Sequence, residues 1–339
     1  MAQPISFEYP ERVNLAQTPT ALEKMERLSE KYGVEIYFKR DDYTGTELSG
    51  NKVRKLEFIL HHAQKLGADT VLTCGGAQSN HCRATAFAAK KLGMKAVLLL
   101  RTPDPENPPS VEANILLDCL ADARILWITP EQYQQRDMLF AWYAEQLLAE
   151  GAAPYIIPEG GSNALGSWGY VATVEELVAD IALLDGDAVS TTVISAVGSG
   201  GTTAGLAMGN QLLGAGFRII GVNVCDDEEY FRQIIGRITD DFYTKYLDQP
   251  LVTDKDYEIL DGYVGRGYAL SKPQELEAIR DLAQLEGVVL DPVYTGKAYY
   301  AMISELEKDR NCFGPRIIFV HTGGLFGLFS ISEEIAEVL

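Results

Sequence analysis

The stretch Glu47-Leu48-Ser49-Gly50-Asn51-Lys52-Val53-Arg54-Lys55-Leu56-Glu57-Phe58 places a lysine at the start of a predicted helix. Behind Lys52, apolar residues recur at helical spacing, which predicts a helix with one buried face; they are Val53, Leu56, Ile59, Leu60, Ala63 and Leu66. A lysine on such a rigid base can lose its charge and form a Schiff base with an aldehyde. The alternative is a solvated lysine at a helix start, because most lysines are exposed.

The composition argues against several classes of protein and partner. The 339 residues carry a formal net charge of −19, which would repel nucleic acid and anionic membrane surfaces. The five cysteines lack C-x-x-C spacing, so we predict free thiols and neither a disulfide framework nor a metal site. No apolar run approaches the ~20 residues that cross a bilayer, and the first residues do not resemble a signal peptide. We expect a cytoplasmic globular protein of about two domains.

Short apolar strands alternate with helical patterns along the chain. Strands are predicted near residues 34–40, 70–73, 96–100, 124–128, 154–158, 191–197, 218–224 and 316–320. Helices are predicted between these strands. Two have both ends predicted, at residues 130–150 and 272–286. Of the others, three end near residues 32, 91 and 213, and three begin at 52, at 111 and after 166. This alternation indicates parallel βαβ units, whose ligands bind at the carboxyl ends of the strands. The polar segment 240–255 gives no clear prediction.

The loop from Gly198 to Gly205 is the candidate phosphate site. It joins a strand to a helix, and its glycines allow close approach to the free N–H groups of the helix start. Thr202 and Thr203 add hydroxyl groups. A dinucleotide site is an alternative, with Asp226 or Asp227 on the ribose, although Thr203 stands where the third glycine of that motif belongs. A tight turn without ligand is the other alternative.

Gln78-Ser79-Asn80-His81 also lies between a predicted strand and helix. Ser79 can cap the helix, so the N–H groups of its first turn can bind a carboxylate. Asn80 offers a donor and an acceptor suited to a phenolic oxygen. An ordinary helix cap, with His81 as a structural histidine, is the alternative.

Tyr294 lies in a turn formed by Pro292 and Gly296. A tyrosine in such a turn can serve packing as well as chemistry. Its phenol becomes a useful proton donor or acceptor only if its neighbours depress its pKa.

Together, six segments resemble the D-cysteine desulfhydrase and 1-aminocyclopropane-1-carboxylate deaminase family of pyridoxal phosphate enzymes. They are residues 47–58, 75–84, 158–170, 198–206, 290–297 and 319–324, in the family's order and approximate spacing. The resemblance implies an α/β fold of type II, the tryptophan synthase β-like architecture, with two open, twisted, mostly parallel sheets flanked by helices. It implies a large cofactor-binding domain of residues 1–51 and 164–339 and a small domain of residues 52–163.

The resemblance also implies a role for individual residues. Lys52 would form the Schiff base with pyridoxal 5'-phosphate, and Asn80 would contact the phenolic oxygen. Ser79, Asn80 and His81 would hold the substrate carboxylate, while Tyr268 and Tyr294 would line the substrate face; Lys52, Ser79, Tyr268 and Tyr294 are the expected catalytic residues. The phosphate would lie on Gly198, Ser199, Gly200, Gly201, Thr202 and Thr203, and Thr295 or Thr322 would face the pyridine nitrogen.

Two positions discriminate within the family. The resemblance implies that a deaminase carries Glu and Leu at these positions and that a desulfhydrase carries Ser or Thr at both. In this chain the two residues are Thr295 and Thr322. A hydroxyl group leaves the pyridine nitrogen less protonated than a carboxylate does, which suffices for β-elimination and suits cyclopropane opening poorly. The match is closest to the plant-type desulfhydrases.

We therefore expect a cytoplasmic, homodimeric carbon–sulfur lyase of amino-acid metabolism that converts D-cysteine and water to pyruvate, sulfide and ammonia. L-Cysteate or another β-substituted alanine is the alternative substrate, and for a sulfonate Arg266 is the cationic candidate. 1-Aminocyclopropane-1-carboxylate deamination is less favoured. The alternatives of other classes are a nicotinamide-binding oxidoreductase and a ligand-binding protein without activity on the same fold.

Overall fold

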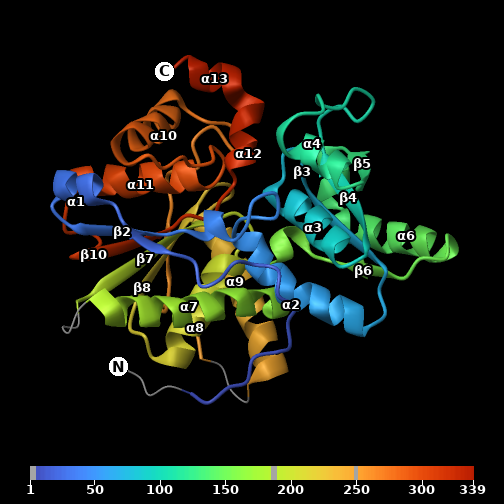
Figure 1. Cartoon of the computed structure of the whole chain (residues 1–339), viewed down its shortest axis with the longest axis horizontal. Helices are drawn as coiled ribbons and strands as arrows, with labels where there is room; N and C mark the ends of the chain where they lie inside the picture. The colour runs from blue at the N-terminus through green and yellow to red at the C-terminus, as the bar shows by residue number, and fades with distance from the viewer. Residues whose placement is uncertain (1–4, 185–188, 248–250) are drawn as a thin grey trace.

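Two open sheets, one in each of two lobes, organise the part of the chain that the computed structural model describes, residues 5–184, 189–247 and 251–339 (Figure 1). The large-lobe sheet has the order β1 (Leu22–Lys24), β2 (Glu35–Lys39), β10 (Arg316–Val320), β7 (Thr191–Val197), β8 (Arg218–Asn223) and β9 (Glu258–Leu260). Its neighbouring strands run parallel except β1 and β2. The small-lobe sheet is parallel, in the order β5 (Arg124–Ile128), β4 (Lys95–Arg101), β3 (Thr70–Gly76) and β6 (Pro154–Ile156).

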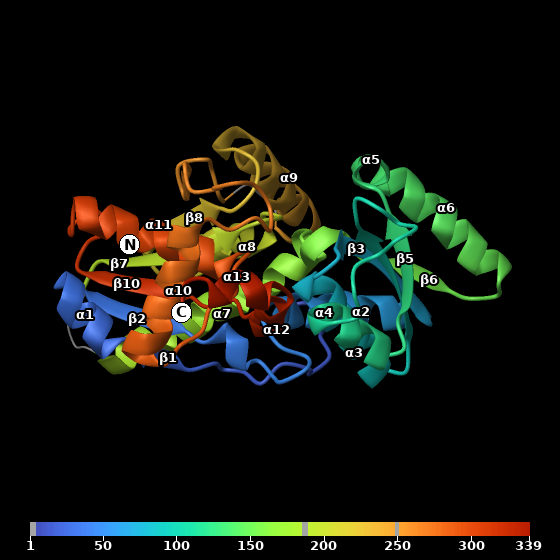
Figure 2. The same cartoon turned by 90° about the horizontal axis from the view of Figure 1, so that it is seen from above.

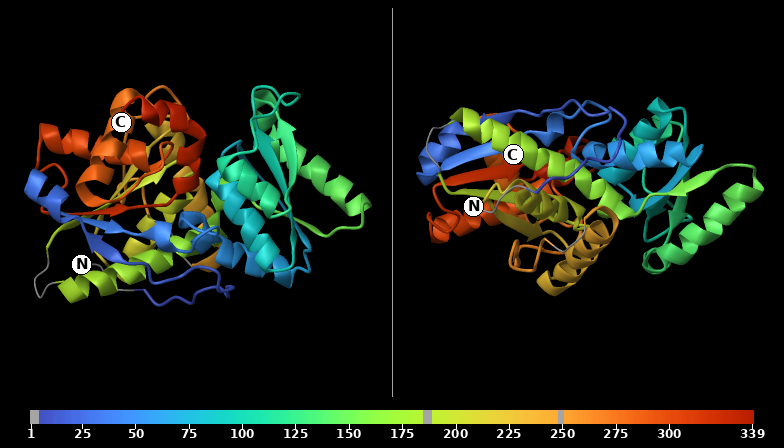
Figure 3. Two further views of the ribbon diagram at one scale, coloured as in Figure 1. Left: turned by 45° about the horizontal axis from the view of Figure 1, so that its top comes forward. Right: turned by 90° about the horizontal axis from the view of Figure 1, so that it is seen from below.

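Helices cover both faces of each sheet, as expected for parallel strands. In the small lobe they are α2 (Asn51–Lys65), α3 (Asn80–Lys91), α4 (Ala113–Leu120), α5 (Pro130–Gln134) and α6 (Arg136–Ala149). In the large lobe they are α1 (Glu26–Tyr32), α7 (Ala164–Leu184), α8 (Gly201–Leu213), α9 (Glu228–Tyr246), α10 (Pro273–Glu286), α11 (Thr295–Lys308), α12 (Leu325–Leu328) and α13 (Ser332–Ala336). Figure 3 shows α6 on the outer face of the small-lobe sheet, with α2 and α3 on the face toward the large lobe.

The buried residues of the central strands explain this layering. Along β7, Val193 packs into the cluster that contains α7 and α8, and the next residue, Ile194, packs into the cluster that contains α10 and α11. Successive side chains of a strand point to opposite faces, so a fully apolar strand predicts helices on both sides. Leu98 and Leu99 of β4 divide in the same way between the two clusters of the small lobe.

A buried network of charged side chains fixes α2 against the large lobe. The Arg54 guanidinium contacts Asp41 at 2.8 Å and Glu176 of α7 at 2.7 Å. Lys39 of β2 contacts Glu176 at 2.9 Å, and the Tyr170 hydroxyl donates to Asp41 at 2.6 Å. Because α2 starts at the junction of the lobes (Figure 2), this network determines where Lys52 lies.

The structure corrects two predictions of secondary structure and assigns part of a segment for which there was none. Residues 22–24 form the edge strand β1, so the helix before residue 32 is shorter than predicted. The helix predicted over 130–150 is broken at Gln135 into α5 and α6. Part of the unreadable segment 240–255 continues α9 to Tyr246, while residues 248–250 lie outside the described residues.

The predicted domain boundaries near residues 52 and 163 fall at the start of α2 and just before α7, and the division itself stays a prediction. Within the described ranges, no helix is long and apolar enough to cross a membrane. The same residues contain no group of three or more His, Cys, Asp or Glu side chains arranged to hold a metal ion.

Candidate functional site

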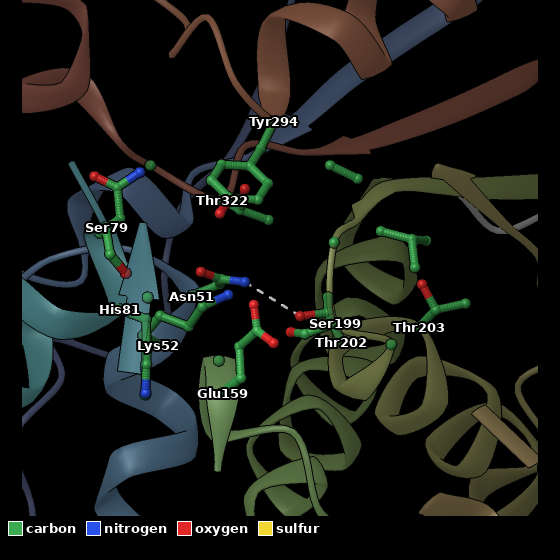
Figure 4. A pocket seen from close by; sticks show the side chains of 18 of the residues that line it. Asn51, Lys52, Ser79, His81, Glu159, Ser199, Thr202, Thr203, Tyr294 and Thr322 are labelled. Carbon is green, nitrogen blue, oxygen red and sulfur yellow. Dashed lines mark hydrogen bonds between the residues drawn. The ribbon is translucent and has the colours of Figure 1, made fainter. Parts of the chain in front are cut away.

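A pocket between the lobes collects most of the predicted site residues. It lies at the carboxyl ends of β3 and β7 and at the starts of α2, α3 and α8. Of the residues predicted from the sequence, Lys52, Ser79, Asn80, His81, Gly198, Ser199, Gly200, Thr202, Thr203, Tyr268, Tyr294 and Thr322 line it. Figure 4 shows Lys52 between Ser79 on the small-lobe side and Ser199 and Thr202 on the large-lobe side, with Tyr294 and Thr322 above.

Lys52 is held as a weakly basic amine. It is the second residue of α2, and its Nζ lies 6.0 Å from the centre of the Tyr294 ring. Burial lowers its pKa to about 8, against the opposing effect of the Asp291 and Glu159 carboxylates. A neutral amine is the nucleophilic form of lysine, so this position favours addition to an aldehyde.

Lys55, one turn further along α2, is a second buried lysine that the sequence analysis did not select. Its Nζ donates to the Gly160 carbonyl at 3.4 Å and to the Ser162 hydroxyl at 3.3 Å. Burial, and then the charge of Lys52, lower its pKa well below the usual lysine value. The three-residue spacing from Lys52 could have indicated a shared helix face, since such residues are neighbours on a helix.

Ser79 is the N-cap of α3, as predicted. Its Oγ accepts a hydrogen bond from the Cys82 N–H at 3.2 Å. His81 is buried, with Nε2 2.8 Å from the Thr73 hydroxyl. Burial and then the charges of Lys52 and Lys55 lower its pKa well below the usual range, so His81 is neutral at pH 7. Its use as an acid–base group is disfavoured, and its predicted contact with a carboxylate stays a prediction.

A hydrogen bond from Asn114 of α4 orients the side-chain amide of Asn80. The Nδ2 of Asn114 donates to Asn80 Oδ1 at 3.0 Å and to the Gln78 carbonyl at 3.0 Å. Because the oxygen of Asn80 accepts from Asn114, the NH₂ group is the part of this amide that can donate to a ligand. This orientation suits an acceptor such as a phenolate oxygen.

The glycine loop provides a cradle for an anion at the start of α8. Gly200, the N-cap, has φ +79°, a left-handed conformation that favours glycine. The Ser162 hydroxyl lies 2.8 Å from Ser199 Oγ and accepts from the Gly201 N–H at 3.2 Å. Thr202 accepts from Asn51 at 3.2 Å. Free N–H groups with these hydroxyls match a phosphate group.

Tyr268 and Tyr294 form a pair of phenols in the lining of the pocket. Their hydroxyl oxygens are 2.7 Å apart, and their rings meet edge to face at 6.0 Å. Burial raises the pKa of both, and the hydrogen bond between them raises that of Tyr294 further. Both phenols are therefore protonated at pH 7, which makes them hydrogen-bond donors, and the lowered pKa that proton transfer by Tyr294 would require is not present here.

The two threonines occupy different environments. Thr322 lines the pocket, whereas Thr295 is fully buried outside its lining and donates its hydroxyl to Asp291 Oδ1 at 2.7 Å. Asp291 also accepts from the N–H groups of Tyr294 and Thr295 at 3.0 and 2.7 Å. It therefore caps the start of α11, a role the sequence analysis missed. Gly201 likewise lies just outside the lining residues.

Other lining residues were not assigned a role from the sequence, although most of them lie in the segments that carry the family resemblance. They include Asn51, Cys74, Gly75, Glu159 and Gly160. Arg266, the predicted cationic contact, is exposed, and its guanidinium lies 3.5 Å from the Ser271 carbonyl. It is not among the residues that line the pocket.

The arrangement has a defined chemistry. An anion cradle lies on one side, a lysine amine of lowered pKa lies between the lobes, and an amide donor lies on the other side. This set fits a phosphorylated aromatic aldehyde with a phenolic oxygen. The lysine would react with the aldehyde, and the protonated tyrosines would face whatever is joined to it.

The chain was compared with known proteins. Residues 13–323 match the family model "Pyridoxal-phosphate dependent enzyme". The chain is 41% identical over 325 residues to a putative 1-aminocyclopropane-1-carboxylate deaminase of Thermotoga maritima, covering 96% of this chain and 99% of that protein. It is 39% identical over 331 residues to a bifunctional D-cysteine desulfhydrase/1-aminocyclopropane-1-carboxylate deaminase of Arabidopsis thaliana, covering 96% and 81%.

A solved structure agrees with these matches. The crystal structure of an ACC deaminase homologue superposes with a TM-score of 0.83 at 33% identity, covering 98% of this chain and 97% of that one. The predicted fold type and cofactor are confirmed, and the nicotinamide alternative has no support. The chain belongs to the pyridoxal phosphate-dependent lyases of the D-cysteine desulfhydrase and 1-aminocyclopropane-1-carboxylate deaminase family.

Proposed function

We propose that this enzyme eliminates sulfide from D-cysteine, giving pyruvate, sulfide and ammonia with the uptake of one water. The observation that carries the proposal is the pair Thr295 and Thr322, because the family resemblance implies Glu and Leu at these two positions in a deaminase. Thr322 lines the pocket, and Thr295 is bonded to Asp291. A hydroxyl group at the pyridine nitrogen is sufficient for β-elimination, in which the thiol is a good leaving group.

In this proposal each residue of the pocket has its own role. Pyridoxal phosphate, when bound, supplies the electron sink for cleavage at the α-carbon. The α8 start would hold its phosphate, and Asn80 would donate to its phenolic oxygen. The start of α3 at Ser79 would bind the substrate carboxylate. Lys52, whose pKa of about 8 lies near neutrality, would take the α-proton, and the Tyr268–Tyr294 pair would hold a proton beside the leaving group.

The test is a panel of four amino acids, D-cysteine, L-cysteine, L-cysteate and 1-aminocyclopropane-1-carboxylate. Pyruvate and 2-oxobutyrate are assayed for each, with sulfide and sulfite measured in parallel. The proposal predicts pyruvate and sulfide from D-cysteine as the main reaction. Sulfite from L-cysteate with little sulfide would identify the sulfonate substrate instead, and 2-oxobutyrate as the main product would identify a deaminase.

We also propose a cytoplasmic homodimer. Support for the dimer comes from exposed apolar side chains on two helices in contact, Leu116 and Leu120 of α4 and Leu325 of α12, with Phe329 just beyond α12. Exposed apolar patches of this kind often mark protein contacts. Light scattering of the purified protein tests it: a monomer mass would contradict the dimer.

A further inference from the structure

Tyr268 is a residue of the large lobe whose side chain contacts the carboxyl end of the small-lobe sheet. It belongs to the loop between β9 and α10, and its ring lies against Gly76, the last residue of β3. A Cβ atom built on Gly76 would lie 3.3 Å from Tyr268 Cε1. Gly76 pairs in register with Arg101, the last residue of β4. The glycine therefore leaves room for the ring beside Arg101.

Arg101 stacks on the ring of Tyr268 from the small lobe. Its guanidinium carbon lies 5.3 Å from the centre of that ring and 4.4 Å from the centre of the Tyr133 ring. Within the described ranges, no acidic side chain forms a salt bridge with Arg101. A guanidinium that has no carboxylate partner and lies near two aromatic rings is attracted to both rings.

The loop that carries Tyr268 is held at its base and at its tip by different contacts. The Nζ of Lys297 donates to the carbonyls of Val264 and Gly267, both at 2.6 Å. Beyond Gly267, the Tyr268 side chain contacts Gly76, Arg101 and Tyr294. Arg101 thus acts on the tip, where the phenol lies, and not on the folding of the loop.

We propose that Arg101 is a positioning residue for Tyr268: its guanidinium holds the ring across the junction of the lobes, so that the Tyr268 hydroxyl meets Tyr294 over the substrate. The alignment of the two tyrosines then depends on the approach of the lobes. Arg101 lies outside the lining residues of the pocket, so its effect passes through Tyr268 and is the same for every substrate. The kinetic part of this inference rests on the proposed function.

The kinetic test uses Arg101→Met and Arg101→Lys, with Arg266→Met as the matched control. Arg266 carries the same charge two residues from Tyr268 but is exposed and faces Ser271. Arg101→Met should lower kcat about threefold to thirtyfold with KM little changed, the range that a cation–π contact supports. Arg101→Lys should restore part of the loss, and Arg266→Met should stay within about twofold of the wild type.

A double-mutant cycle with Tyr268→Phe shows whether the arginine acts through the phenol. In the Tyr268→Phe background, Arg101→Met should cause no further loss of kcat, because effects of residues acting as a unit are not additive. An undiminished loss in that background would overturn the inference. So would a loss confined to L-cysteate, which would make Arg101 a ligand of the anionic substituent.

Hydrogen exchange provides a readout that needs neither substrate nor cofactor. In the protein without added cofactor, Arg101→Met should speed amide exchange in the segment 268–271 and leave α10 unchanged, whereas Arg266→Met should change neither. Unchanged exchange together with unchanged kcat would overturn the inference. If the wild type turns over no member of the panel, the proposed function fails, and the exchange result still decides the role of Arg101.

Discussion

Lys52 and Lys55 lie one turn apart on α2, and both are buried next to the same pocket. Burial lowers the pKa of each, to about 8 for Lys52 and well below the usual value for Lys55. Lys52 lines the pocket, and Lys55 points behind it to Gly160 and Ser162. The two lysines therefore differ in where their side chains point as well as in their pKa, and only Lys52 lines the pocket.

The reactivity of Lys52 should follow its lowered pKa. Below pH 8 the amine is protonated and cannot attack an aldehyde, so the rate of reaction with added pyridoxal phosphate should rise with pH to a midpoint near 8. An exposed lysine would give a midpoint near 10.4. The growth of visible absorbance after mixing, measured across pH with Lys52→Ala as the blank, checks this. A midpoint near 10.4 would contradict the buried position of the amine.

Asn114 should affect the cofactor through Asn80. Replacing it by Asp removes the Nδ2 donor, so the Asn80 amide is no longer held with its oxygen on residue 114. The loss of one such hydrogen bond should weaken pyridoxal phosphate binding about threefold to tenfold. A fluorescence titration of the apoprotein measures this, with the exposed Asn107→Ala as control. Equal affinity in Asn114→Asp and the wild type would show that Asn80 is oriented by other contacts.

Much of this residue-level picture could be predicted from the sequence, but not all of it. Lys52, the cap Ser79 and the glycine loop each have a local signature, a helix start or a strand-to-helix turn. Asn114 and Arg101 have none, because their roles depend on what lies opposite them in space, and Lys55 has only its three-residue spacing from Lys52. The sequence predicts Arg266 as the cation near the substrate because it lies two residues from Tyr268. In the structure, the arginine that contacts the ring of Tyr268 is Arg101.

At the scale of elements, α7 and α8 pack unusually closely beside the pocket. A Cβ on Gly205 would lie 2.5 Å from the Ser167 carbonyl oxygen and 2.5 Å from Tyr170 Cβ. This contact lets α8 start near Lys52, and α7 carries Glu176 of the buried ion network. The helices were predictable from their apolar repeats, whereas the edge strand β1, only three residues long, was not.

Two glycines form a matched pair that tests this packing. Gly205→Ala should lower the free energy of unfolding by about 1–3 kcal/mol, because the added methyl group would overlap α7. Gly236→Ala, in the helix α9 with nothing within 4 Å of its Cβ position, should raise it by about 0.5–1 kcal/mol. Urea unfolding measures both. A stabilising Gly205→Ala would mean that the two helices can separate without cost.

For the whole molecule, the junction of the lobes is the functional feature. The Lys52 helix is anchored in the large lobe by Arg54, while Tyr268 of the large lobe contacts the small-lobe sheet. The alternation of strands and helices predicts parallel sheets with a site at their carboxyl ends, and the family resemblance adds the division into two sheets. It does not predict the contacts across the junction, because these join segments far apart in the chain.

Arg54 should be essential to this anchoring. Burial alone would raise the pKa of Asp41, but Arg54 lowers it overall, so the carboxylate is ionised. Arg54→Met would leave that buried charge unpaired and should cost about 3–5 kcal/mol at pH 7. The difference from the wild type should shrink below pH ~3.9, where Asp of the unfolded chain is protonated. Urea unfolding at two pH values checks this; a difference that grows at low pH would contradict it.

The central claim is that Lys52 is the lysine that binds pyridoxal phosphate, and its most direct test is chemical trapping. The protein saturated with pyridoxal phosphate is reduced with borohydride, digested and mapped by mass spectrometry. The account predicts one phosphopyridoxyl group, on Lys52, and none at that position in Lys52→Ala. A modified Lys55 with Lys52 unmodified, or modification spread over exposed lysines, would contradict it.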